Sequence, residues 1–187
     1  MKHILLIFLI SITTQVFSKD KNIRIILPID SATHSIAYDT IIQASGVNKD
    51  NIFALINQWI AIHYNSAKNV IQLNDKESGI IIVKGIFPTM VSGLSRGERM
   101  VTHTMTIKVK DQKMKVSIDR FGIDLGTYGT YTLEDAIMGT SYGGGSSIRS
   151  CLYPPQRMEI QYNLQAIIMT NFKSMSDALN KKDKTDW

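Results

Sequence analysis

The feature that most constrains the fold is a pair of alternating segments between Thr104 and Asp119. In both segments apolar and polar side chains alternate with a period of two, which places the apolar ones on a single face of a strand. The polar tripeptide Asp111-Gln112-Lys113 separates the segments and predicts a turn. The apolar positions are Met105, Ile107, Val109, Met114, Val116 and Ile118. The pattern predicts a β-hairpin with one buried and one solvated face, so other elements must cover the buried face.

Two segments with helical periodicity are available to cover that face. In both, apolar side chains recur at steps of three and four. Asn48 predicts an N-cap for the first helix, which we expect over residues 49–63. Trp59 lies in its apolar stripe, where a core role is commoner than a place in a ligand pocket. The second helix is expected over residues 157–181, opened by Pro154-Pro155, because proline is tolerated in a first turn.

The remaining β-favouring runs complete a sheet. Strands are expected over residues 23–27 and 36–44, and a second hairpin joins residues 70–73 to residues 79–87 through a polar linker. The run Ile80–Val83 is apolar without alternation, so we expect that strand to be central and covered on both faces. Together these elements predict an α+β domain in which two helices pack on one face of an antiparallel β-sheet.

The N-terminus has the layout of a secretory signal peptide over residues 1–18. Lys2 gives a positive start, an apolar run follows, and Val16 and Ser18 stand at the −3 and −1 positions of a cleavage site. The run is shorter than the roughly 20 residues of a membrane-spanning helix. Lys19 is the first residue expected in the mature chain, where a lipoprotein would need a cysteine. We therefore expect a periplasmic or secreted protein with no transmembrane segment after cleavage.

The composition limits the partners and the redox chemistry. Cys151 is the only cysteine, so no internal disulfide can form. Its simplest role is a small buried side chain, and the alternative is a thiol that pairs with another molecule. The formal net charge is +5 and the pI is about 9.3. Because these charges are scattered and no basic-aromatic motif appears, nucleic acid is not expected as a partner.

Residues 122–150 differ in character from the rest of the chain, because glycine and tyrosine dominate them. We expect a long loop or a ragged edge of the sheet there, with one short helical turn at residues 132–138. Neither a repeat nor a linker divides the remainder. The expected organisation is therefore an N-terminal segment over residues 19–34, a single domain over residues 35–181 and a polar tail over residues 182–187.

A series of short motifs carries a family resemblance. They are Trp59-Ile60-Ala61, Ser66-Ala67-Lys68, Val70-Ile71-Gln72, Asp75-Lys76-Glu77-Ser78-Gly79 and Lys84-Gly85. With these motifs the chain resembles the domain-of-unknown-function family with a TATA-binding-protein-like (TBP-like) fold, found in exported proteins of Bacteroidetes-type bacteria. The resemblance covers residues 35–121 and, more loosely, residues 155–181, whereas the glycine-rich stretch departs from it. It implies a TBP-like half-domain and offers no catalytic residues, and the fold name implies a shape rather than DNA binding.

The motifs of common catalytic and metal sites are incomplete in this sequence. Residues 93–97 match the G-x-S-x-G pattern of a hydrolase, but a hairpin is expected where the helix should follow. His34, His63 and His103 share no metal-ligand spacing, so neither a metal nor a cofactor is predicted. We expect His63 to cap the last helical turn or border the core, and His103 to be exposed.

The resulting prediction is a non-enzymatic binding or structural module of the cell envelope, with an unknown protein or small-molecule ligand. An apolar open face of the sheet would serve a partner or a homodimer, unless residues 23–29 fold over it. The alternative is an envelope enzyme with its site in residues 122–150. Nucleic-acid binding by the open face is a third hypothesis, which rests on the pI and the fold name alone. The candidate ligand or partner residues are Tyr128, Tyr131, Tyr142 and Arg149.

Overall fold

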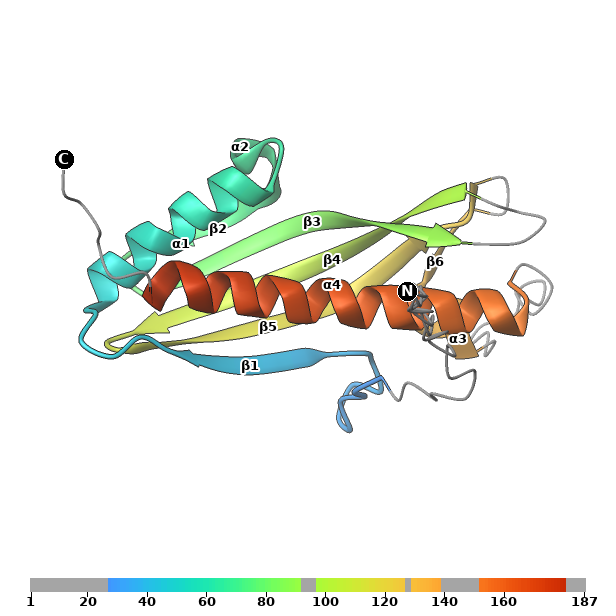
Figure 1. The fold of residues 1–187 in the computed structure, drawn as a ribbon, viewed down its shortest axis with the longest axis horizontal. Coiled ribbons are helices and arrows are strands. Elements are labelled where there is room, and N and C mark those ends of the chain that lie inside the picture. Colours follow the sequence, from blue (N-terminus) through green and yellow to red (C-terminus); the bar gives the residue numbers. More distant parts are fainter. Residues whose placement is uncertain (1–26, 92–96, 127–128, 139–151, 181–187) are drawn as a thin grey trace, which may run out of the picture.

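An antiparallel sheet forms the frame of the molecule (Figure 1). The computed structural model describes residues 27–91, 97–126, 129–138 and 152–180. Within them the strands run in the order β1-β5-β4-β3-β2, and β6 pairs with β5. The strands are β1 (Tyr38–Gln43), β2 (Ile71–Asp75), β3 (Ile80–Val91), β4 (Gly97–Lys110), β5 (Lys113–Asp124) and β6 (Thr130–Thr132). The hairpin predicted between residues 104 and 119 is the β4–β5 pair.

Two long helices, α1 (Lys49–His63) and α4 (Pro154–Asn180), pack on the same face of this sheet (Figure 1). Helix α1 begins where it was predicted, because the Asn48 side chain accepts a hydrogen bond of 2.9 Å from the Asn51 N–H. The short helices are α2 (Ala67–Val70) and α3 (Leu133–Met138). The α+β architecture with two helices on one face is confirmed.

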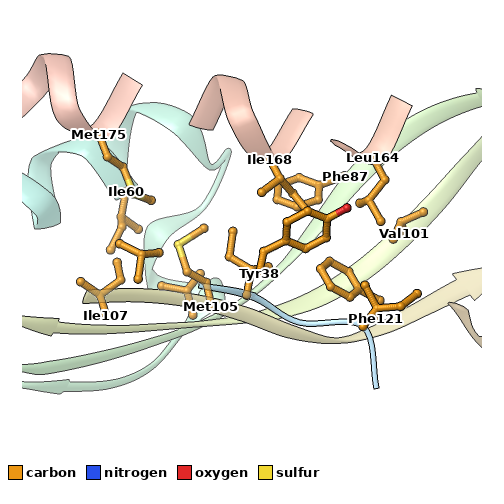
Figure 2. Close-up of a cluster of buried hydrophobic side chains, with 14 of the residues drawn as sticks. Tyr38, Ile60, Phe87, Val101, Met105, Ile107, Phe121, Leu164, Ile168 and Met175 are labelled. Carbon is orange, nitrogen blue, oxygen red and sulfur yellow. The ribbon is translucent and has the colours of Figure 1, made fainter. Parts of the chain in front are cut away.

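The hydrophobic core lies between this face and the two long helices (Figure 2). Ile60 from α1 and Ile168 from α4 are fully buried against strand residues such as Met105. Full burial of such a side chain contributes about 1.5–3 kcal/mol. All the apolar positions of the alternating hairpin are buried, as predicted: Met105, Ile107, Val109, Met114, Val116 and Ile118.

The prediction that the strand containing Ile80–Val83 is covered on both faces is wrong. Strand β3 lies next to the edge strand β2, and only one of its faces meets the helices. Ile81 and Val83 are fully buried on that face, whereas Ile80 and Ile82 are half-buried on the other. The apolar run without alternation therefore marks an apolar open face, because no described element covers it.

The central strands are longer than predicted. Strand β3 continues to Val91 and β4 begins at Gly97, so this pair extends well beyond the predicted bounds. Strand β5 continues past Asp119 through a bulge, where one extra residue is inserted and Arg120 adopts a φ of 52°. The bulge shifts the alternation by one position, which returns Phe121 to the buried face.

The stretch 122–150 holds more regular structure than the predicted loop. It contains the end of β5, β6 and α3, and α3 matches the helical turn predicted over residues 132–138. The rest of the predicted loop falls at residues 127–128 and 139–150, outside the described residues. For the part that the structure describes, a long irregular loop is therefore wrong, whereas the alternative of a ragged edge agrees with the three-residue strand β6 paired with the end of β5.

The start of the described chain lies beside α3 and not over the open face. Leu27 belongs to the hydrophobic core, and the Ile36 N–H donates a 2.7 Å hydrogen bond to the Glu134 carboxylate of α3. The predicted signal peptide, Cys151, most of the predicted strand over residues 23–27 and the polar tail lie outside the described residues.

Candidate functional site

One histidine lies in the core, where the sequence predicted exposure. His103 is 2% exposed on the helix-covered face of β4. Its ring stacks on Phe87 with centroids 3.7 Å apart, and its Nε2 lies 3.1 Å from the Tyr64 hydroxyl oxygen. The predicted exposure is wrong because His103 does not begin the strand: β4 reaches back to Gly97, and His103 is in phase with the buried Val101 and Met105.

A glycine makes room for this histidine and its tyrosine partner. A Cβ at Gly85 would lie 2.5 Å from Cε1 of Tyr64 and 2.7 Å from Cε1 of His103. Burial lowers the pKa of His103 to about 4, and the Val101 carbonyl opposes this effect only in part. Burial also raises the pKa of Tyr64 well above its usual range. Both groups are thus neutral near pH 7, and the cluster stabilises the core without offering a charged group to a ligand.

A second polar cluster joins α1 to α4. His63 Nδ1 lies 2.9 Å from the Trp59 carbonyl oxygen, and its Nε2 lies 3.0 Å from the Ser174 Oγ. The Trp59 Nε1–H donates to the same Oγ at 3.0 Å. Because a carbonyl oxygen can only accept a hydrogen bond, the Nδ1 of the neutral ring must carry the proton and donate to it. The Nε2 is then free of a proton and accepts a hydrogen bond from the Ser174 hydroxyl. The result is a serine–histidine pair whose histidine is oriented by a main-chain oxygen.

This pair has part of the geometry of a nucleophilic site. Ser174 lies within α4, where neighbouring N–H groups are bonded inside the helix and so are not available to stabilise an oxyanion. His63 is exposed and stacks on Trp59 with ring centroids 4.2 Å apart. We interpret the cluster as a link between the helices. The predicted core role of Trp59, which is 3% exposed, is confirmed.

The site predicted in residues 122–150 is described only in part. Tyr131 lies on β6, half-buried and opposite Ile123. Tyr128, Tyr142 and Arg149 lie outside the described residues, so their convergence stays a prediction. In the described part of the chain, no group of three or more His, Cys, Asp or Glu residues could hold a metal ion. None of the helices described is long and apolar enough to cross a membrane.

The face of the sheet opposite the helices carries large apolar side chains. Ile86 on β3 is 55% exposed and Met90 is 56% exposed, while their neighbour Phe87 is buried under the helices. Pro88 is exposed and lies directly opposite Met100 of β4, so the two share this face. We name Ile86, Pro88, Met90 and Met100 the apolar patch. Two further exposed apolar side chains on this face are Ile41 and Leu73.

Four lysines gather at the other end of the same face, next to the β4–β5 turn. Lys108 lies directly opposite Lys115, and Lys110 lies directly opposite Lys113. We name these four residues the lysine cluster. Lys115 forms an ion pair of 3.3 Å with Asp39, whereas the other three form none with another described residue. Like charges that face each other across strands destabilise a sheet, so this arrangement favours an anionic partner.

A hollow of about 600 Å³ opens beside the lysine cluster. Lys49 of α1 joins Lys108, Lys110 and Lys113 on its walls, which also include Asp111. The Lys49 Nζ is held in place because it donates a 2.6 Å hydrogen bond to the Glu77 carbonyl oxygen. Because several lysines and one carboxylate line the hollow, it carries excess positive charge and would attract anions.

These lysines do not belong to a scattered positive charge, as the sequence predicts, but lie together at one end of a sheet face. The useful signal was their spacing, since Lys108 and Lys110 on one strand and Lys113 and Lys115 on the next flank a short turn. Alternation places each pair on one face, and the turn places the two pairs opposite each other. The sequence could therefore have predicted this cluster, but not the hollow, which also needs α1.

Comparisons with known proteins agree on the fold. The model of a domain of unknown function with a TBP-like fold, DUF4468, matches residues 38–124. The crystal structure of a TBP-like protein from Parabacteroides distasonis is similar with a TM-score of 0.66 and 16% identity, over 84% of this chain and 99% of that chain. The crystal structure of a DUF4468 family protein from Bacteroides ovatus is similar with a TM-score of 0.61 and 14% identity, over 84% of this chain and 92% of that chain. Comparison with curated proteins gives no significant match.

Proposed function

We propose that this chain, which matches the model of the DUF4468 family of domains with a TBP-like fold over residues 38–124, is an exported, non-enzymatic binding module of the cell envelope. The proposed binding surface is the face of the sheet opposite the helices, and the proposed partner carries negative charge. The observation that carries the proposal is the combination of large exposed apolar side chains with the lysine cluster on a single face.

The packing of the described residues supports this choice of face. Exposed apolar side chains scattered singly are ordinary on a protein surface, but neighbouring ones on paired strands suit an interaction site. The apolar patch is made by residues in register on β3 and β4, among them Pro88 and Met100. By contrast, the Nε2 of His103 is bonded to Tyr64 and the Oγ of Ser174 to His63, and the His103 ring is buried, so these two clusters serve the packing of the fold.

Export is supported by the sequence of residues 1–18. We expect secretory cleavage between Ser18 and Lys19 when the full chain is expressed in a bacterium. N-terminal sequencing of the protein recovered outside the cytoplasm should then begin at Lys19. Recovery of the protein in the cytoplasm with its first eighteen residues intact would contradict the proposed location.

The binding surface is tested by photocrosslinking in cells that express the full chain. A photoreactive amino acid replaces Ile86 on the open face, and a matched protein carries it at Met169 on α4, which has a similar exposure of 49%. We expect crosslinked adducts from position 86 and few from position 169. Adducts from position 169 alone, or from neither position, would refute the choice of face.

A further inference from the structure

We propose that the partner is the surface of an anionic lipid bilayer. In this arrangement the lysine cluster contacts phosphate headgroups, and the apolar patch enters the interfacial region beneath them. The inference rests on the proposed function, because it uses the same face of the sheet, and it goes further by naming the chemistry of the partner.

The lysines supply the charge complementarity. Lys108 and Lys110 project from β4, and Lys113 comes directly after the turn, so the three charges lie together at one end of the open face. They have no ion-pair partner among the described residues, and each faces another lysine across the strands. Phosphate groups in a bilayer would relieve this repulsion and attract each lysine near the surface.

The apolar patch distinguishes a bilayer from a soluble polyanion. Ile86, Met90 and Met100 are between 41% and 56% exposed, and an interfacial layer is a favourable environment for such side chains. A nucleic acid would instead be expected to stack its bases on aromatic rings. Tyr38 and Phe87 point into the core with the other buried aromatic residues, and the described strands place no aromatic side chain in the apolar patch.

The outer face of α4 is the competing candidate for a membrane contact. It exposes Met158, Tyr162 and Met169, which recur at helical spacing. The lysine described on this side, Lys173, forms an ion pair of 3.2 Å with Asp177. This face therefore lacks the uncompensated positive charge that the open face of the sheet has, and the charge argument favours the sheet.

The first experiment measures co-sedimentation of the purified protein with phosphatidylcholine vesicles, with and without phosphatidylglycerol. The test variant is K108Q/K110Q/K113Q, and the matched control is K68Q/K76Q/K173Q, which removes the same charge from exposed lysines elsewhere. Because each lysine near an anionic surface contributes about fivefold in affinity, the test variant should bind about 100-fold more weakly. The control should bind as the parent does, and high salt should weaken the parent.

The second experiment tests the apolar contribution. The variant I86S/M90S should lose binding to anionic vesicles and should bind a single-stranded oligonucleotide no differently from the parent. Thermal unfolding of each variant shows whether it remains folded. Equal vesicle binding by the parent and I86S/M90S would overturn the inference. A higher affinity for the oligonucleotide than for vesicles would also overturn it and favour a nucleic acid.

The outcomes separate this inference from the proposed function. If crosslinks form from position 86 to a protein while anionic vesicles are not bound, the lipid inference fails and the binding surface stands. If those crosslinks join two copies of this chain, the face is a homodimer surface and the lipid inference fails as well. If neither crosslinks nor vesicle binding occur, both proposals fail.

Discussion

The burial of His103 predicts that the protein loses stability as the pH falls below about 6.5, the usual pKa of a histidine. In the unfolded chain this imidazole takes up a proton below that pH. In the folded protein burial lowers its pKa to about 4, so the ring stays neutral between the two values. The unfolded state then binds more protons than the folded state, and the free energy of unfolding must fall with falling pH in this window.

The size of the effect follows from the difference between the two pKa values. Each pH unit within the window costs about 1.4 kcal/mol, so the loss is about 2 kcal/mol between neutral pH and pH 5 and reaches about 3 kcal/mol near pH 4. The stabilisation is fully present above the unfolded pKa. Below the folded pKa nothing more is lost from this group, because both states are then protonated.

Urea unfolding at a series of pH values measures this loss. His103→Phe removes the titrating group and retains a flat ring to stack on Phe87, and Tyr64→Phe in the same chain removes the hydroxyl that would otherwise lose its partner. We expect the difference in unfolding free energy between parent and double variant to change by about 2 kcal/mol from neutral pH to pH 5. His34→Asn is the control, because it removes an exposed imidazole at a φ of 55°, which asparagine tolerates, and leaves the buried one. An unchanged difference across the series would refute the reasoning.

Three other substitutions test the packing. Gly85→Ala should lower the free energy of unfolding by about 1–3 kcal/mol, because the new Cβ would lie 2.5 Å from Tyr64. Gly97→Ala, whose Cβ has only one ordinary contact, at 3.7 Å, is the control for urea unfolding. Asn48→Ala should cost about 1 kcal/mol through loss of the helix cap, and an unchanged unfolding midpoint would contradict that role. Ser174→Ala should cost about 1–2 kcal/mol in urea unfolding, and a phosphonate probe that labels the parent but not this variant would contradict a purely structural link.

The elements with strong local signals could be predicted from the sequence. Alternation of period two located the β4–β5 hairpin, and helical spacing together with the Asn48 cap located α1 with its bounds. The two prolines at the start of α4 marked its first turn within a few residues. These signals are local, because the side-chain period and the cap depend on neighbouring residues only.

The errors came from features that depend on distant parts of the chain. His103 was expected at the surface as the first residue of a strand, whereas the pairing with β3 extends β4 back to Gly97 and places His103 in phase with the buried Met105. The coverage of Ile80–Val83 depends on which strands lie beside it and on which face the helices pack. The bulge at Arg120 likewise hid the continuation of β5, because it reverses the alternation.

The candidate site was less predictable than the fold. The Ser174–His63 contact joins residues 111 positions apart, and it exists only because α4 packs along α1. The hollow beside the lysine cluster needs Lys49 from α1 next to the β4–β5 turn. The apolar patch depends on the register of β3 with β4, which brings Pro88 opposite Met100.

The central claim is that the open face of the sheet binds a partner. The most direct test measures binding and stability separately. A photoreactive amino acid at Ile41, which is 60% exposed on this face, reports the bound partner in cells, with or without the substitutions Ile86→Ser and Met90→Ser. We predict that these substitutions abolish the adduct from position 41 and leave the midpoint of thermal unfolding unchanged. An undiminished adduct, or a large fall in the midpoint, would contradict the account.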